Sequence, residues 1–96
     1  MLYALICIDK PNSIELRASK RPEHLAYLGS LGDVMKFAGP FLDDAGSPIG
    51  SLVMIEAETR GAAEVIAAAD PYELAGLFAS VDIKAWRWAL KNPETK

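Results

Sequence analysis

The 96-residue sequence contains one cysteine, one histidine and no cluster of lysines and arginines. A single cysteine cannot close a disulfide within the chain, and with a single histidine it cannot supply the usual four ligands of a zinc site. The net charge is −3, so the chain lacks the positive surface that neutralises the phosphates of a nucleic acid. We therefore expect no metal and no nucleic-acid partner.

No apolar run is long enough to cross a membrane. The run at residues 2–8 reads LYALICI and is stopped by Asp9 and Lys10. It is too short for a membrane span and lacks the basic leader of a signal peptide, so we expect a cytoplasmic protein without membrane contact. Cys7 lies inside this run and is expected to be a buried structural thiol.

Apolar residues, in contrast, are abundant. They make up 51% of the chain, which is high for a small protein, because surface dominates at this size. A chain of this length has room for one core, so we expect a single domain over residues 1–96. The apolar excess points to self-association.

The order of the expected elements predicts the fold. Apolar runs of strand length occur at residues 2–8, 33–42, 51–58 and 79–90. Proline is tolerated only in the first turn of a helix, so Pro22 predicts a short irregular or helical piece at residues 14–18, then a separate helix capped by Ser19 and ended by Gly32. A second helix follows Thr59. This β-α-β-β-α-β order predicts an α+β, ferredoxin-like fold with a four-stranded antiparallel sheet.

The two faces of this sheet differ in what covers them. Two helices cover only one face, toward which Met35 and Phe37 are expected to point, with Lys36 toward solvent. By the same alternation Trp86 and Trp88 point away from the helices. Soluble monomers rarely expose so large an apolar patch, so we expect a homodimer with the sheets packed face to face about a twofold axis.

His24 is predicted to point into the interior. At 100° per residue, Tyr27, Leu28 and Leu31 lie within about 60° of it, so the apolar stripe of the helix is centred on the imidazole. A buried imidazole needs a partner, because an unpaired polar group costs about 1–3 kcal/mol. The pattern leaves two roles open: a core histidine bonded to a backbone carbonyl, or the acid–base group of a site.

Asp70 is the candidate partner for this imidazole. Because it precedes Pro71, Asp70 should end one helix in an extended conformation, and Glu73 completes an Asp-x-x-Glu capping box that stabilises the next helical turn by roughly 1 kcal/mol. A cap uses one carboxylate oxygen, and the other can accept from an imidazole N–H. Such a bond would fix the tautomer of His24 and favour its use as a general acid or base.

Other polar and aromatic side chains are candidates for lining a cleft. Ser51 is the best hydroxyl nucleophile, but a strand-edge serine bonded to backbone explains it as well, so we expect no Ser-His-Asp hydrolase. Tyr27, Phe41 and Tyr72 either line the cleft or pack in the core. Gly39 either lets a ligand approach the backbone or serves a turn.

Arg17 lies seven residues before His24. Because Pro22 separates the two and disturbs the helical phase, we expect Arg17 to be a solvated surface residue. If it reached the cleft, it would favour an anionic substrate such as a carboxylate.

Several motifs together resemble the YciI-like, or YCII-related, proteins. They are RPEHLAYL at residues 21–28, AGPF at 38–41, the Gly50-Ser51 pair and ADPYELAGLFASVDIKAW at 69–86. The resemblance runs over nearly the whole chain in order. It implies a ferredoxin-like fold that dimerises as an α+β barrel, and an active site on a histidine and an aspartate that match His24 and Asp70. It also implies lyase- or dehydrochlorinase-like chemistry, as in some similar proteins of aromatic degradation.

These observations support more than one function. The first is a cofactor-free enzyme, in which His24 and Asp70 move a proton of a small apolar or aromatic substrate in an elimination or isomerisation. The second is a homodimeric domain that binds a small ligand without chemistry. Two further alternatives are a purely structural histidine–aspartate pair and a cofactor-free oxygenation, which the tryptophans allow but no residue requires.

Overall fold

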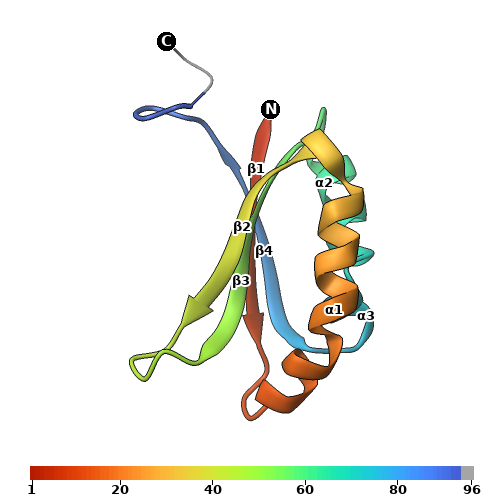
Figure 1. The fold of residues 1–96 in the computed structure, drawn as a ribbon. Coiled ribbons are helices and arrows are strands. Elements are labelled where there is room, and N and C mark those ends of the chain that lie inside the picture. Colours follow the sequence, from red (N-terminus) through yellow and green to blue (C-terminus); the bar gives the residue numbers. More distant parts are fainter. Residues whose placement is uncertain (94–96) are drawn as a thin grey trace.

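The structure is a computed structural model that describes residues 1–93, and it contains one antiparallel sheet with its helices on one face (Figure 1). The strands are β1 (Leu2–Asp9), β2 (Met35–Leu42), β3 (Pro48–Glu56) and β4 (Phe78–Trp86), in the order β2-β3-β1-β4. The helices are α1 (Ile14–Ser30), the one-turn 3-10 helix η1 (Gly32–Val34), α2 (Arg60–Ala68) and α3 (Pro71–Leu74). The predicted α+β, ferredoxin-like fold is confirmed.

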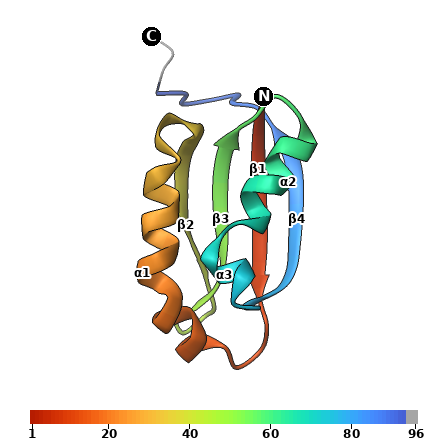
Figure 2. The same cartoon turned by 90° about the vertical axis from the view of Figure 1, so that its right-hand side faces the viewer.

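The helices divide the covered face between them. Figure 2 shows α1 on the β2 side of the sheet and α2 over β1 and β4, with the short α3 following α2. Each pair of neighbouring strands is antiparallel. Because β1 and β3 lie in the middle of the sheet, their inward side chains form the centre of the core.

Helix α1 is longer than the sequence predicts. It runs unbroken through Pro22, and Ser19 does not cap it, because the Ser19 hydroxyl donates to the carbonyl of Leu16. A proline inside a helix removes one backbone hydrogen bond and costs about 3 kcal/mol. Packing of the buried face that carries Arg17 and His24 offsets this cost.

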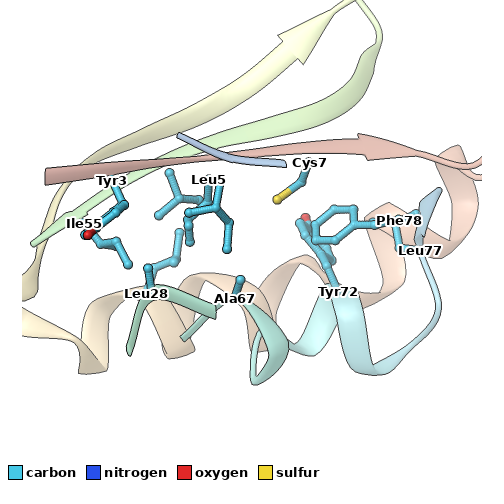
Figure 3. Close-up of a cluster of buried hydrophobic side chains, with 12 residues drawn as sticks. Tyr3, Leu5, Cys7, Leu28, Ile55, Ala67, Tyr72, Leu77 and Phe78 are labelled. Atoms are coloured by element: carbon cyan, nitrogen blue, oxygen red, sulfur yellow. The ribbon is translucent and has the colours of Figure 1, made fainter. Parts of the chain in front are cut away.

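The core lies between the sheet and the helices (Figure 3). The thiol of Cys7 is buried there, as predicted, and burial raises its pKa to about 12, with the charges of Asp70 and Glu73 adding to the effect. The buried side chains of this cluster are Tyr3, Leu5, Cys7, Leu28, Val53, Ile55, Ala63, Ala67, Tyr72, Leu77, Phe78 and Ile83.

The predicted orientation of Phe37 is wrong, because β2 contains a bulge. Met35 pairs with Ile55, but Phe37 pairs with Met54, the next residue back along β3. A bulge of one residue at Lys36 reverses the alternation of side chains. Met35 therefore packs against the core, whereas Phe37 lies on the face that no helix covers.

The uncovered face carries an aromatic cluster of Phe37, Trp86 and Trp88. The ring centroid of Phe37 lies 6.2 Å from that of Trp86 and 5.8 Å from that of Trp88, in edge-on geometry. The two tryptophan rings are 5.0 Å apart. The strand β4 ends at Trp86, four residues before the predicted end at residue 90. Phe37 and Trp86 keep 37% and 36% of their surface exposed.

Candidate active site

A cavity of about 550 Å³ lies between α1 and the strands β2 and β3. This volume falls in the range of small-molecule sites, about 300–1,000 Å³. Its walls are mostly apolar, and its polar groups come from α1, β3 and α3. The residues that line it are Ile14, Arg17, Ala18, Arg21, His24, Leu25, Leu28, Ala38, Gly39, Pro40, Leu42, Pro48, Ser51, Leu52, Val53 and Tyr72.

The side chains of His24 and Asp70 meet at the wall of this cavity. The Nδ1 atom of His24 lies 2.9 Å from each carboxylate oxygen of Asp70, and both residues are buried. A carboxylate oxygen can only accept, so Nδ1 carries the hydrogen. In the neutral ring Nε2 is then a bare acceptor, and it makes no hydrogen bond to the residues that the structure describes.

Asp70 also begins the short helix α3. Its Oδ1 accepts from the backbone N–H of Tyr72 at 2.9 Å, so the cap and the histidine contact coexist, as the sequence predicts. The predicted reciprocal bond of the capping box is not formed, because the Asp70 N–H donates to the carbonyl of Ala67. The carboxylate is thereby fixed by two elements, the helix α1 and the first turn of α3.

The ring of Tyr72 lies between two cationic or ionisable side chains of α1. It stacks on the His24 imidazole with centroids 4.0 Å apart and an interplanar angle of 15°, and the Arg17 Cζ lies 4.6 Å from its centroid. Burial raises the pKa of the Tyr72 hydroxyl, although the charge of Arg17 opposes the change. Tyr72 therefore remains a neutral phenol, and it lines the cavity.

Arg17 is not the solvated surface residue that the sequence predicts. Its side chain is 7% exposed and forms a two-point ion pair with Asp9, with Nε at 2.7 Å from Oδ2 and one terminal nitrogen, Nη2, at 3.1 Å from Oδ1. The same Nη2 donates to the Ser51 hydroxyl at 2.8 Å. Burial alone would lower the pKa of Arg17, but the hydrogen bond and charge of Asp9 raise it, so the guanidinium stays charged.

Of the other residues predicted to line the cleft, some lie in the cavity wall and others do not. Ser51, Gly39 and Tyr72 line the cavity, and Ser51 contacts Arg17 instead of His24. Tyr27 lies outside the lining, because its hydroxyl donates to the carbonyl of Ile66 at 2.7 Å and ties α1 to α2. Phe41 also lies outside it, since it pairs with Gly50 on the uncovered face of the sheet.

Two lining residues, Arg17 and Arg21, were missed as site residues. In an unbroken α-helix a spacing of seven residues brings Arg17 to the same face as His24. Pro22 hid this signal, because a proline at this position predicts a break in the helix. Arg21 lines the cavity but is exposed, so it lies at the rim.

Two features are absent from the described residues. Within residues 1–93, no three side chains among His, Cys, Asp and Glu lie close enough to hold a metal ion. Among the helices described, none is both long and apolar enough to span a membrane.

Comparisons with known proteins agree on one family. The family model of the YCII-related domain matches residues 1–87. Protein YciI of Escherichia coli O6:H1 is 40% identical over 95 residues, covering 91% of this chain and 97% of that protein. An uncharacterized protein of Haemophilus influenzae is 36% identical over the same shares of the two chains.

Solved structures are similar as well. The 5-chloro-2-hydroxyhydroquinone dehydrochlorinase TftG from Burkholderia phenoliruptrix AC1100, solved in complex with 2,5-dihydroxybenzoquinone, superposes with a TM-score of 0.85. It is 31% identical, over 93% of this chain and 96% of its own. A NIPSNAP family protein from Agrobacterium tumefaciens, with a TM-score of 0.58 and 16% identity over 98% and 97% of the chains, shows the fold alone.

Proposed function

This chain belongs to the YCII-related domain family, and we propose that it is a small-molecule enzyme of the lyase type that works without a cofactor. The observation that carries the proposal is the His24–Asp70 contact at the cavity wall, with Nδ1 at 2.9 Å from both carboxylate oxygens. The dehydrochlorinase activity named for the structural relative TftG supports the same reaction class.

In the proposed reaction His24 is the general base. Asp70 holds the hydrogen on Nδ1, so the lone pair of Nε2 is available to a ligand in the cavity. Nε2 takes a proton from a hydroxyl group or a carbon of the substrate, and the electron pair left behind moves into the substrate's unsaturated system. On a ring, the carbon that bears the chloride then takes this proton from the imidazolium and becomes tetrahedral. Nε2 next removes a second hydroxyl proton, the new electron pair forms a C=O group and shifts the ring double bonds, and chloride departs with the C–Cl bonding pair. The net loss is one proton and one chloride ion. The imidazolium returns its proton to water, so no oxidant or reductant is needed.

The cavity supports a flat and mostly apolar substrate. Leu25 and Leu28 of α1 and Val53 of β3 form its aliphatic walls. Tyr72 also lines the cavity, but both faces of its ring are covered, by His24 and by Arg17, so it holds these two side chains in place. We propose a small ring compound with an acidic hydroxyl group, of the same chemical class as the compounds named for TftG.

We also propose that the protein is a homodimer that buries the uncovered face of its sheet. Phe37, Trp86 and Trp88 form a continuous aromatic cluster there, and Ile8 on the same side is 41% exposed. Apolar patches of this kind mark contact surfaces, and a twofold axis lets one patch cover its copy.

Chloride release from 5-chloro-2-hydroxyhydroquinone tests the proposed reaction. The variant His24→Gln keeps a polar side chain but has no titratable nitrogen, so kcat should fall by about 10²–10⁴, the usual contribution of a general base. A matched control is Glu64→Gln, because Glu64 is exposed on α2, lies outside the cavity lining and pairs with Arg60 at 3.3 Å. A His24→Gln protein that releases chloride at the wild-type rate would contradict the proposal. Saturable binding with no product in the wild type would favour the non-catalytic ligand-binding alternative.

A further inference from the structure

The charged side chains of residues 1–93 that line the cavity are all basic. Among the described residues that line it, Arg17, Arg21 and His24 carry basic groups, and no aspartate or glutamate is included. The carboxylates of Asp9 and Asp70 are bonded to Arg17 and His24 and are not part of the lining. A ligand in the cavity therefore meets the N–H groups of the two arginines and the Nε2 acceptor of His24, while the two carboxylates stay outside the lining.

Arg17 has one nitrogen left for a ligand. Its Nε donates to Asp9, and its Nη2 donates to both Asp9 and Ser51. The remaining nitrogen, Nη1, makes no hydrogen bond to residues 1–93, yet it is not sealed from solvent, since these residues contain no buried side-chain nitrogen or oxygen without a partner. Arg17 itself lines the cavity, so the two N–H groups of Nη1 are available to a ligand.

The guanidinium is also held in a fixed orientation. Three hydrogen bonds and the Tyr72 ring, 4.6 Å from Cζ, restrict its rotation. A buried and pre-oriented donor binds an anionic oxygen at low entropic cost, and arginine suits carboxylates and similar anions through its planar fork. Arg21, one turn later on α1 and at the rim, adds a second positive charge.

We propose that the cavity selects ligands that carry an anionic oxygen on a flat ring, and that Nη1 of Arg17 binds this oxygen with Arg21 supporting it. This inference rests on the proposed function because it concerns the same cavity, and it assigns the substrate class that the cavity takes. Tyr72 separates Arg17 from His24, so the anionic oxygen and the group that loses the proton lie at opposite ends of the ligand. Ser51 and Asp9 are then positioning residues for Arg17.

The test is calorimetric binding of matched ligand pairs to the full chain. Benzoate is compared with benzamide, and 4-nitrophenolate with 4-nitroanisole, because the members of each pair differ mainly in their negative charge. We expect the anion to bind about 10–100-fold tighter in at least one pair, as one charge-assisted hydrogen bond predicts. The pair that shows the difference identifies the anion as a carboxylate or a phenolate.

Variants of the two arginines locate the effect. Arg17→Lys keeps a charge opposite Asp9 but has no second nitrogen to reach the cavity, so the preference for the anion should disappear. Arg21→Gln should lower the affinity for the anion about threefold to tenfold, and added salt should reduce the difference in affinity between this variant and the wild type. Lys20→Gln is the matched control, because it removes the same charge from the neighbouring residue of α1, outside the lining, and its affinities should equal those of the wild type.

Defined outcomes overturn the inference. Equal affinity for the anion and its neutral partner in both pairs does so, and so does an unchanged preference in Arg17→Lys and Arg21→Gln. If circular dichroism shows that Arg17→Lys is unfolded, the affinities of the wild type for the ligand pairs and the affinities of Arg21→Gln still test the inference. Failure of the proposed function is separate, because His24→Gln would then turn over substrate normally whatever the ligand preference.

Discussion

Replacing Asp70 by asparagine separates its structural role from its proposed role in proton transfer. The asparagine side-chain oxygen can still accept from the Tyr72 N–H, as Oδ1 of Asp70 does at 2.9 Å, and asparagine is as good a cap as aspartate. Its amide NH2 group then faces Nδ1 of His24 and donates to it. The ring hydrogen therefore moves to Nε2, and the base that faces the cavity is lost.

The structure gives different magnitudes for two substitutions at this position. Asp70→Asn exchanges a charge-assisted hydrogen bond for a neutral one, which costs about 1 kcal/mol of unfolding free energy. Asp70→Ala removes the cap, at about 1 kcal/mol, and leaves the buried imidazole unpaired, at about 1–3 kcal/mol. The total of about 2–4 kcal/mol should lower Tm by roughly 10–30 °C for a chain of this size.

Two measurements check this prediction. Nitrogen-15 NMR of the imidazole should show the hydrogen on Nδ1 in the wild type and on Nε2 in Asp70→Asn. In the same variant kcat should fall by about 10²–10⁴ while Tm falls by only about 4–8 °C. An Asp70→Asn protein with wild-type kcat, or with its hydrogen still on Nδ1, would refute the assignment of Asp70 as the group that orients His24.

Three further predictions concern the rest of the molecule. Gly50→Ala should lower the free energy of unfolding in urea by about 1–3 kcal/mol, because the added Cβ would overlap the carbonyl oxygen of Cys7. Gly29→Ala should raise it by up to about 1 kcal/mol, because no atom lies within 4 Å of the added Cβ and alanine favours the helix α1. Equal effects of the two substitutions would contradict this prediction. The pKa of Cys7 is about 12, above its ordinary value of 9.0, so between these pH values the folded chain keeps a proton that the unfolded chain loses. The free energy of unfolding should therefore fall over this pH range, and more steeply in the wild type than in Cys7→Ala. Parallel plots of unfolding free energy against pH for the two proteins would exclude the thiol as the cause. We expect sedimentation to show a dimer for the wild type and a folded monomer for Phe37→Glu, which places a charge in the aromatic patch. A monomeric wild type at micromolar concentration would exclude the proposed dimer.

The sequence was sufficient for the fold because its patterns are local and regular. Continuous apolar runs predicted the central strands, and the order of elements predicted the ferredoxin-like topology that the structure confirms. The meeting of His24 with Asp70 was also predictable. The helical phase placed the imidazole in the core, and the Asp-Pro step placed a carboxylate where a helix begins.

The sequence was insufficient where tertiary packing overrides a local rule. Pro22 predicted a helix boundary, but packing of the buried face of α1 carries the helix through it, and this continuity brings Arg17 into the site. The bulge at Lys36 leaves no local signal, so Phe37 was assigned to the wrong face of the sheet. Tyr27 was expected near the cavity as one of two alternatives, and only the position of α2 decides that its hydroxyl bonds to backbone.

The most direct measurement is a crystal structure of the protein with 2,5-dihydroxybenzoquinone, the compound bound in the structure of TftG. Our account predicts that the ring lies in the cavity beneath α1, with one oxygen at about 2.6–3.2 Å from Nε2 of His24 and another within hydrogen-bond distance of Nη1 of Arg17. A ligand bound elsewhere, or one in the cavity with its polar atoms turned away from Nε2, would contradict the central claim.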